Sequence, residues 1–595
     1  MFWLGLFLIF RIAHSQPANV LMYHNDLAGT GQNLTETILT PATVNSNTFG
    51  KLFSIPLDGY VFPAPLYLSG VNIPGKGIHN VVFVATAHDT VYAFDADSNH
   101  GTNATPLWKV SFIDPLAGIT TIPSTVLGFT DPPEIGIMGT PVIDASSGTI
   151  YVVAKIRDAS SVPLRYLARL YALDVASGDA KFGSPVDIQG SAPGNGIGSS
   201  GGILSFNPLY EANRCGLLLL NGVVYITFAS HNDTGPYHGC IVGYDAQTLE
   251  QVAYFYTTPN GSQGGIWMSA GAPTADEDGN IYCVTGNGAF DLNNGGVDFG
   301  NTFLKLATGG TNIFVSDYFA PYNASALNAG DQDLGTCSPL LLPDSTGSAA
   351  HPRLLVAGSK TGAVYLVDRN NMGYFNAFNN GQIVQSLQVA PLWNTLAYFN
   401  NLIYICPANN SLAAYRIANG QLSTAPMTRS THKFSATGAS PSISANETNG
   451  AIVWVIEKDA SFAGRGPAVL RAYDAMNLTN QFYSSNDAGT RDQLQIAKEF
   501  QVPVIANGKV YVATQSGLSV FGTFASVQPR LYISPTLGIT LEGHVGDTYG
   551  IQYSTNLTDW AEIDIVTLFA SPQLLEELAT SSMDPQGFYR AVLKP

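Results

Sequence analysis

Two short segments near the middle of the chain carry residue types that could hold a cofactor or a metal ion. Trp267 stands where comparable stretches have small or aliphatic residues, and Asn287 lies between glycines in the segment Thr285-Gly286-Asn287-Gly288. Glycines let the backbone approach a ligand closely, and an asparagine oxygen is a good ligand for a hard cation. The alternatives are a packing role for Trp267 and a left-handed turn at Asn287.

A third group of candidates carries charge. Asp331 and Asp333 lie in a loop flanked by glycines, where carboxylates could bind calcium or act as a base. They share one side of the chain only if this segment is extended, because side chains alternate along a strand. Lys360 begins an apolar stretch in a chain of which only 12% is charged. The alternatives are a solvated acidic turn and an ordinary surface turn.

The elements that must position these residues belong to an internal repeat. A turn residue followed by a Tyr- and Val-rich stretch recurs along the chain, and a second apolar stretch follows each copy. The first stretches are residues 81–86, 149–154, 223–228, 280–285, 354–358, 402–407, 451–456 and 509–514. The second stretches end at Asp95, Asp174, Asp245, Asp368 and Asp474, and in degenerate form at Leu306, Arg416 and Gly522.

A third apolar stretch precedes each pair, and a fourth follows the aspartate turn, as at 106–112 in the first repeat. Four antiparallel strands make one blade, so the chain is predicted to be an all-β, eight-bladed propeller, which hides its sheet edges by closure. No fourth strand follows the last repeat, and segment 51–57 near the N-terminus is expected to supply it. Seven blades with one miscounted repeat, or a solenoid, are the alternatives.

Both ends of the chain differ from the repeat. Residues 1–15 have a short apolar run that ends in small residues, which is typical of a signal peptide and predicts a secreted, periplasmic or cell-surface protein. Residues 16–50 are an N-terminal extension, and 51–525 are assigned to the propeller. Residues 526–595 alternate like a small β-sandwich and resemble C-terminal modules of secreted proteins from environmental bacteria, which implies attachment or sorting.

Composition narrows the classes of function. The 43 acids and 26 bases give a net charge of −17, which argues against nucleic acid or an anionic membrane as partner. Beyond the first residues, no segment has the unbroken apolar run of about 18 residues that a membrane span needs. The five cysteines lack the CxxC spacing of metal or haem sites. Cys215 and Cys240 fall in one repeat and could pair, although buried free thiols are favoured.

Taken in order, the candidates resemble the quinoprotein alcohol dehydrogenases, eight-bladed propellers that bind pyrroloquinoline quinone (PQQ) with calcium or a lanthanide. The resemblance covers about residues 50–522 and includes AFDADS followed by Trp108. It implies that Trp267 stacks under the quinone and that Asn287, in TGN, binds the metal. It also implies that Lys360, in KTGAVYLVDR, contacts the quinone.

The same resemblance implies that Asp333 or Asp331 is the catalytic base and, more loosely, that Asp233 is a metal ligand. The chain departs from the family in having no adjacent cysteine pair, no Trp in the aspartate loop and no haem domain. Two functions follow. The first is a metal- and PQQ-dependent oxidoreductase acting on an alcohol or sugar hydroxyl. The second is a non-catalytic scaffold that binds a protein or glycan at or outside the cell envelope.

Overall fold

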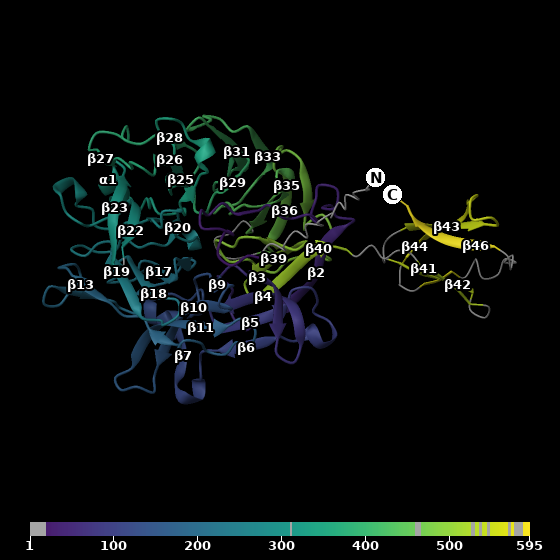
Figure 1. Cartoon of the computed structure of the whole chain (residues 1–595), viewed down its shortest axis with the longest axis horizontal. Helices are drawn as coiled ribbons and strands as arrows, with labels where there is room; N and C mark the ends of the chain where they lie inside the picture. The colour runs from purple at the N-terminus through teal and green to yellow at the C-terminus, as the bar shows by residue number, and fades with distance from the viewer. Residues whose placement is uncertain are drawn as a thin grey trace, which may run out of the picture. The chain divides into compact units, whose positions relative to one another are not determined.

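The computed structural model describes residues 19–309, 312–458, 466–524, 530–534, 538–543, 548–568, 573–575 and 587–594. The chain forms two compact units, Met1–Thr523 and Phe524–Pro595 (Figure 1). The predicted signal peptide at 1–15 lies outside the described residues. Within them, no helix is both long and apolar enough to cross a membrane.

Strands dominate the first unit, as predicted, and form eight successive antiparallel blades (Figure 1). The first strands are β3 (Leu66–Ile73), β9 (Val142–Asp144), β16 (Leu218–Leu220), β20 (Thr274–Ala275), β24 (Leu340–Leu341), β29 (Ala397–Phe399), β34 (Ser442–Asn446) and β38 (Val504–Ala506). The second strands are β4 (Gly77–Thr86), β10 (Thr149–Asp158), β17 (Val223–Ser230), β21 (Ile281–Val284), β25 (Leu354–Gly358), β30 (Leu402–Ile405), β35 (Asn449–Glu457) and β39 (Lys509–Thr514).

The third strands are β5 (Thr90–Asp95), β11 (Arg165–Asp174), β18 (Cys240–Asp245), β22 (Phe303–Gly309), β26 (Ala363–Asp368), β31 (Ser411–Ala418), β36 (Val469–Asp474) and β40 (Gly517–Thr523). The fourth strands are β6 (Trp108–Ser111), β12 (Val186–Asp187), β19 (Gln251–Tyr256), β23 (Asn312–Ala320), β28 (Gln385–Gln388), β33 (Thr428–Lys433), β37 (Gln481–Ser484) and β2 (Phe49–Pro56). Among the described residues the one α-helix is α1 (Ala324–Ala329), before the fifth blade.

The recurring tyrosines and aspartates of the repeat have a shared structural role. Each aspartate ends a third strand and accepts a hydrogen bond from the backbone N–H of the second residue after it, as Asp95 does from Asp97 at 2.9 Å. This bond fixes the turn that follows the strand. The tyrosine of a second strand donates to a carbonyl just after the aspartate of the next blade, as Tyr151 does to Ala246 at 2.7 Å. The repeat therefore encodes contacts between blades as well as the strands themselves.

The ring closes as the sequence predicts. Strand β2, from the N-terminal part of the chain, pairs antiparallel with β40 and becomes the fourth strand of the last blade. The Tyr511 hydroxyl of that blade donates to the Ala96 carbonyl of the first blade at 3.4 Å, and the Tyr67 and Tyr511 rings lie 6.0 Å apart. The last blade thus packs on the first, and β2 covers the edge of β40 that would otherwise be unpaired.

The N-terminal extension forms a belt that sequence analysis did not anticipate. Residues 20–36, the N-terminal belt, contact the blades in chain order at their first strands. The belt's backbone bonds are Val20 with Tyr67, Leu21 with Ile143, Leu27 with Ala275, Ala28 with Leu341, Thr30 with Tyr398 and Gly31 with Ile443. Tyr23 packs on Gly216 at the third blade, and Glu36 accepts from the N–H of Gly508 at the eighth. Because one short segment reaches all eight blades at or beside their first strands, these strands surround the axis and the belt fills it.

In its described residues, the second unit contains two three-stranded antiparallel sheets. One has the order β41 (Arg530–Ser534), β42 (Gly538–Glu542) and β45 (Gln573–Leu575). The other has the order β44 (Ala561–Thr567), β43 (Thr548–Ser554) and β46 (Phe588–Leu593). Buried side chains from both sheets share one small core, among them Leu541 and Ile551.

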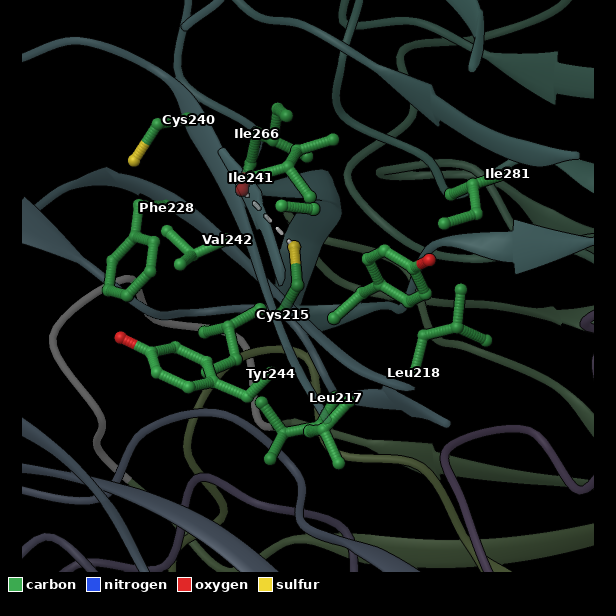
Figure 2. Close-up of a cluster of buried hydrophobic side chains, with 14 of the residues drawn as sticks. Cys215, Leu217, Leu218, Phe228, Cys240, Ile241, Val242, Tyr244, Ile266 and Ile281 are labelled. Atoms are coloured by element: carbon green, nitrogen blue, oxygen red, sulfur yellow. Dashed lines mark hydrogen bonds between the residues drawn. The ribbon is translucent and has the colours of Figure 1, made fainter. Parts of the chain in front are cut away.

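All five cysteines are buried free thiols. Cys215 and Cys240 lie apart in one apolar cluster, and the Cys215 thiol instead donates to the Ile266 carbonyl at 3.3 Å (Figure 2). The pairing considered for these two residues is therefore wrong, and the favoured alternative of free thiols is confirmed. Burial raises the pKa of Cys215 to about 12, so this thiol is a packing group.

Candidate functional site

All six candidate residues from the sequence line one cavity of about 390 Å³. Its walls are loops that precede the first strands and loops that follow the second strands. Because neighbouring strands run antiparallel, these two kinds of loop lie at the same end of the blades. The predicted residues on its wall are Asp233, Trp267, Asn287, Asp331, Asp333 and Lys360.

Four of these residues contact one another directly. The Lys360 ammonium lies 2.8 Å from Asp331 Oδ2 and 3.5 Å from Asp333 Oδ2. The Asn287 backbone N–H donates to Asp333 Oδ1 at 2.9 Å, and the Asn287 side-chain amide donates to Asp331 Oδ1 at 2.9 Å. The aspartate loop is thus bonded to the ends of two second strands, β21 and β25.

Trp267 belongs to the same network. Its indole N–H donates to Asp333 Oδ1 at 3.4 Å. A Cβ at Gly286 would lie 2.5 Å from that oxygen and 2.9 Å from the indole nitrogen, so only glycine leaves room for this contact. The sequence suggested that this glycine admits a ligand; in the structure it admits two neighbouring side chains.

The backbone around the cavity is strained. Met268, Ser269 and Ala270, which follow Trp267, have φ values of 36°, 48° and 60°. Asp331, on the opposite loop, has a φ of 52°. Left-handed non-glycine residues cost about 1 to 3 kcal/mol each, and they concentrate where function requires a particular geometry. These left-handed residues fix the course of the chain on two sides of the cavity.

Asp233 lines the cavity in a separate set of contacts. Its Oδ1 accepts from the Tyr237 hydroxyl at 2.8 Å, and its backbone N–H donates to Ser230 Oγ at 3.1 Å. Burial raises the pKa of Tyr237, so this phenol remains a donor. No hydrogen bond or ion pair joins Asp233 to the other five predicted residues within the described part of the chain.

The charge state of the network depends mainly on burial. Burial raises the pKa of the Asp333 carboxyl, and the opposing influences are the Asn287 N–H and the positive charge of Lys360. Asp331 differs, because 74% of its side chain is exposed, against 13% for Asp333. Of the two aspartates, Asp333 therefore has the environment expected of a general base.

Other residues of the cavity wall were not predicted from the sequence, among them Arg214, Trp393 and Phe500. The Arg214 guanidinium lies over the Trp267 ring, 5.2 Å from its centroid, and the Phe500 ring meets the same indole edge-on at 6.1 Å. Trp393 lines the cavity as well. Arg214 stands directly before the apolar run 215–220, and a cation at the start of a first strand is a signal that could have identified it. Phe500 and Trp393 lie outside any recognisable motif.

The residues fit a quinone more closely than a metal ion. A planar, anionic quinone such as PQQ needs an aromatic surface and a cation, which Trp267 and Lys360 supply in one cavity. Over the described residues, no three His, Cys, Asp or Glu side chains converge on a point where a metal could bind. The Asn287 amide oxygen already accepts from Asn301 at 3.0 Å. The metal role of Asn287 and Asp233 stays a prediction.

No protein-family model and no curated protein sequence matches the chain. Solved structures do match. A quinohemoprotein alcohol dehydrogenase from Pseudomonas putida HK5 has a TM-score of 0.54 at 13% identity, over 87% of this chain and 84% of that one. The corresponding enzyme from Comamonas testosteroni has a TM-score of 0.53 at 13% identity, over 87% and 83%.

BamB from Moraxella catarrhalis matches 80% of this chain and 99% of its own, at 13% identity and a TM-score of 0.45. Identities this low show the fold alone. The chain therefore has the β-propeller fold of the quinohemoprotein alcohol dehydrogenases.

Proposed function

We propose that the protein is a quinoprotein oxidoreductase that holds PQQ in the 390 Å³ cavity and oxidises an alcohol or sugar hydroxyl. One observation carries the proposal. Six residues chosen from their order in the sequence come from separate loops between residues 233 and 360, and all of them line one cavity. If the predicted signal peptide is functional, the reaction takes place outside the cytoplasm.

The roles of the chain's own residues follow from their contacts. When bound, PQQ supplies the acceptor for the hydride that leaves the alcohol carbon. Trp267 offers its ring for stacking, and Lys360 offers an ammonium to an anionic oxygen. Asp333 Oδ1 already accepts from Asn287 and Trp267, so Oδ2 is the atom that takes the hydroxyl proton. The substrate leaves as the corresponding carbonyl compound.

One observation favours the second candidate, a non-catalytic propeller that binds an envelope protein or glycan. Arg214 covers one face of the Trp267 ring. A quinone must use the other face or displace this guanidinium. A propeller that retained only the architecture would have no need to keep the indole accessible.

The test is titration of the full chain with PQQ, followed by calorimetry, in chelator, in calcium and in lanthanum. Lys360→Gln and Trp267→Ala are expected to weaken PQQ binding at least tenfold, because each removes a proposed contact. Lys109→Gln is the matched control, since Lys109 pairs with Asp58 in the first blade, outside this cavity. Asn287→Ala tests the metal role. If Asn287 binds the metal, this variant should lose only the part of PQQ binding that depends on metal. No PQQ binding in any of the three conditions would refute the proposal and favour the scaffold.

A further inference from the structure

A second cavity of about 320 Å³ adjoins the first. The two share four wall residues, Arg214, Asn232, Glu499 and Phe500. The remaining wall of the second cavity, here the adjoining cavity, is largely apolar, with Phe62, Phe129 and Met138 among its residues. A cavity of this size and lining suits a compound with a single aromatic ring.

The charges on the wall of the adjoining cavity do not balance in pairs. Lys458 forms an ion pair with Glu499, and Lys498 lies 2.9 Å from Asp131. These pairs use both acids of the wall. Arg214 has no ion pair and no side-chain hydrogen bond with any described residue, although the charges of Glu499, Asp233 and Asp333 act on it from a distance. Its guanidinium lies over the Trp267 ring. A partly exposed guanidinium without a paired carboxylate can form a charge-assisted, bidentate contact with a ligand carboxylate.

A second polar group on the same wall also lacks a partner. His231 is 5% exposed, and its Nε2 makes no hydrogen bond within the described part of the chain. Burial keeps the pKa of His231 well below its usual range, so the ring is a neutral imidazole that can donate one hydrogen bond. Arg214 and His231 share only the adjoining cavity, because His231 does not line the first one.

We infer that the adjoining cavity binds an aromatic carboxylate, with its carboxylate at Arg214 and His231 and its ring among Phe62, Phe129 and Phe500. The site does not depend on the proposed quinone. If both ligands bind, the shared wall at Arg214 and Phe500 places the carboxylate compound beside the quinone cavity. The oxidised substrate is then an aromatic hydroxy acid.

The test uses phenylacetate and its uncharged counterpart phenylacetamide, titrated into the full chain without quinone. Phenylacetate is expected to bind at least tenfold more tightly than the amide. Arg214→Gln should remove that difference by weakening the acid alone, and His231→Asn should weaken the acid severalfold. Lys498→Gln is the matched control, because Lys498 lines the same cavity but pairs with Asp131, and it should change the acid's Kd less than threefold.

Equal binding of acid and amide, no binding of either, or an equal loss in Lys498→Gln would overturn the inference. Even if Arg214→Gln fails to fold, the comparison of phenylacetate with phenylacetamide on the unaltered chain shows whether the carboxylate is recognised. Lys360→Gln separates the two proposals, since it should weaken PQQ binding and leave phenylacetate binding unchanged. Loss of PQQ binding and loss of phenylacetate binding can therefore be observed independently of each other.

Discussion

Asp333 shows at the scale of one residue how the proposed chemistry opposes stability. Its carboxylate is mostly withdrawn from water, and this burial raises its pKa. An acid whose pKa is higher in the folded chain than in the unfolded chain destabilises the fold once the pH exceeds its ordinary value. Two hydrogen bonds and Lys360 reduce the cost without removing it. Such a residue persists where a proton acceptor is needed.

Asp333→Asn is expected to be more stable than the unaltered chain at neutral pH, because the amide keeps an acceptor oxygen and carries no charge. The folded state of the unaltered chain binds the Asp333 proton more tightly, so its stability falls as the pH rises above the ordinary value of 3.8. The advantage of the variant should therefore shrink as the pH approaches 4. Denaturant unfolding at a series of pH values measures this. A variant less stable at every pH would mean that the charged form is the favoured one.

Residue types and their order identified six members of the cavity wall, but they could not identify Arg214, Trp393 or Phe500. Trp267, Asn287 and Lys360 stand beside repeat strands with recognisable local patterns. Arg214 matters because the fold sets it over Trp267 and gives it no ion-pair partner among the described residues. Such a property depends on which loops meet in space, and no spacing along the chain records it.

At the scale of the element, the strands were predictable and the N-terminal belt was not. Strand stretches carry Tyr, Val and Asp at fixed places, because these residues bond one blade to the next. The belt bonds mostly through its backbone, with carbonyls of Leu21, Leu27 and Gly31 as acceptors. Backbone groups are alike in every residue, so the sequence of the belt has no pattern to reveal its partners.

His24 makes the belt sensitive to acid. It is 5% exposed, and burial lowers its pKa to about 4. The unfolded chain therefore takes up a proton at pH 6.5 that the folded chain refuses, and stability falls as the pH drops from 6.5 towards 4. His24→Asn, which suits the left-handed φ of 57° and does not titrate, should reduce the loss between pH 6.5 and about pH 5 by roughly 2 kcal/mol. Thermal unfolding of both chains across this range measures it, and parallel curves would exclude His24 as the cause.

At the scale of the whole molecule, both cavities belong to the first unit. Every wall residue of both cavities lies at or before Phe500, inside the first unit. The second unit has its own small core of Ile539, Leu541 and neighbours. The spacing of the repeats predicts eight blades and closure by β2. It does not predict the function of the second unit, because the strands of that unit carry no chemical motif.

A chain ended after Thr523 is expected to fold and to bind PQQ and phenylacetate with Kd values within twofold of the full chain. The reason is that no wall residue is removed and that β40, which ends at Thr523, still pairs with β2. Calorimetric titration of both chains provides the comparison. Loss of binding in the shorter chain would show that the second unit supports the cavities.

The N-terminal belt has a consequence for synthesis on the ribosome. The belt and β2 are made early, yet partners of Gly31, Glu36 and β2 lie between Ile443 and Thr523. These early segments must stay unpaired while most of the first unit is translated. A product that terminates in a late blade has neither a closed ring nor a filled axis, and its exposed strand edges invite aggregation. The ring can therefore close only after translation of the first unit is complete.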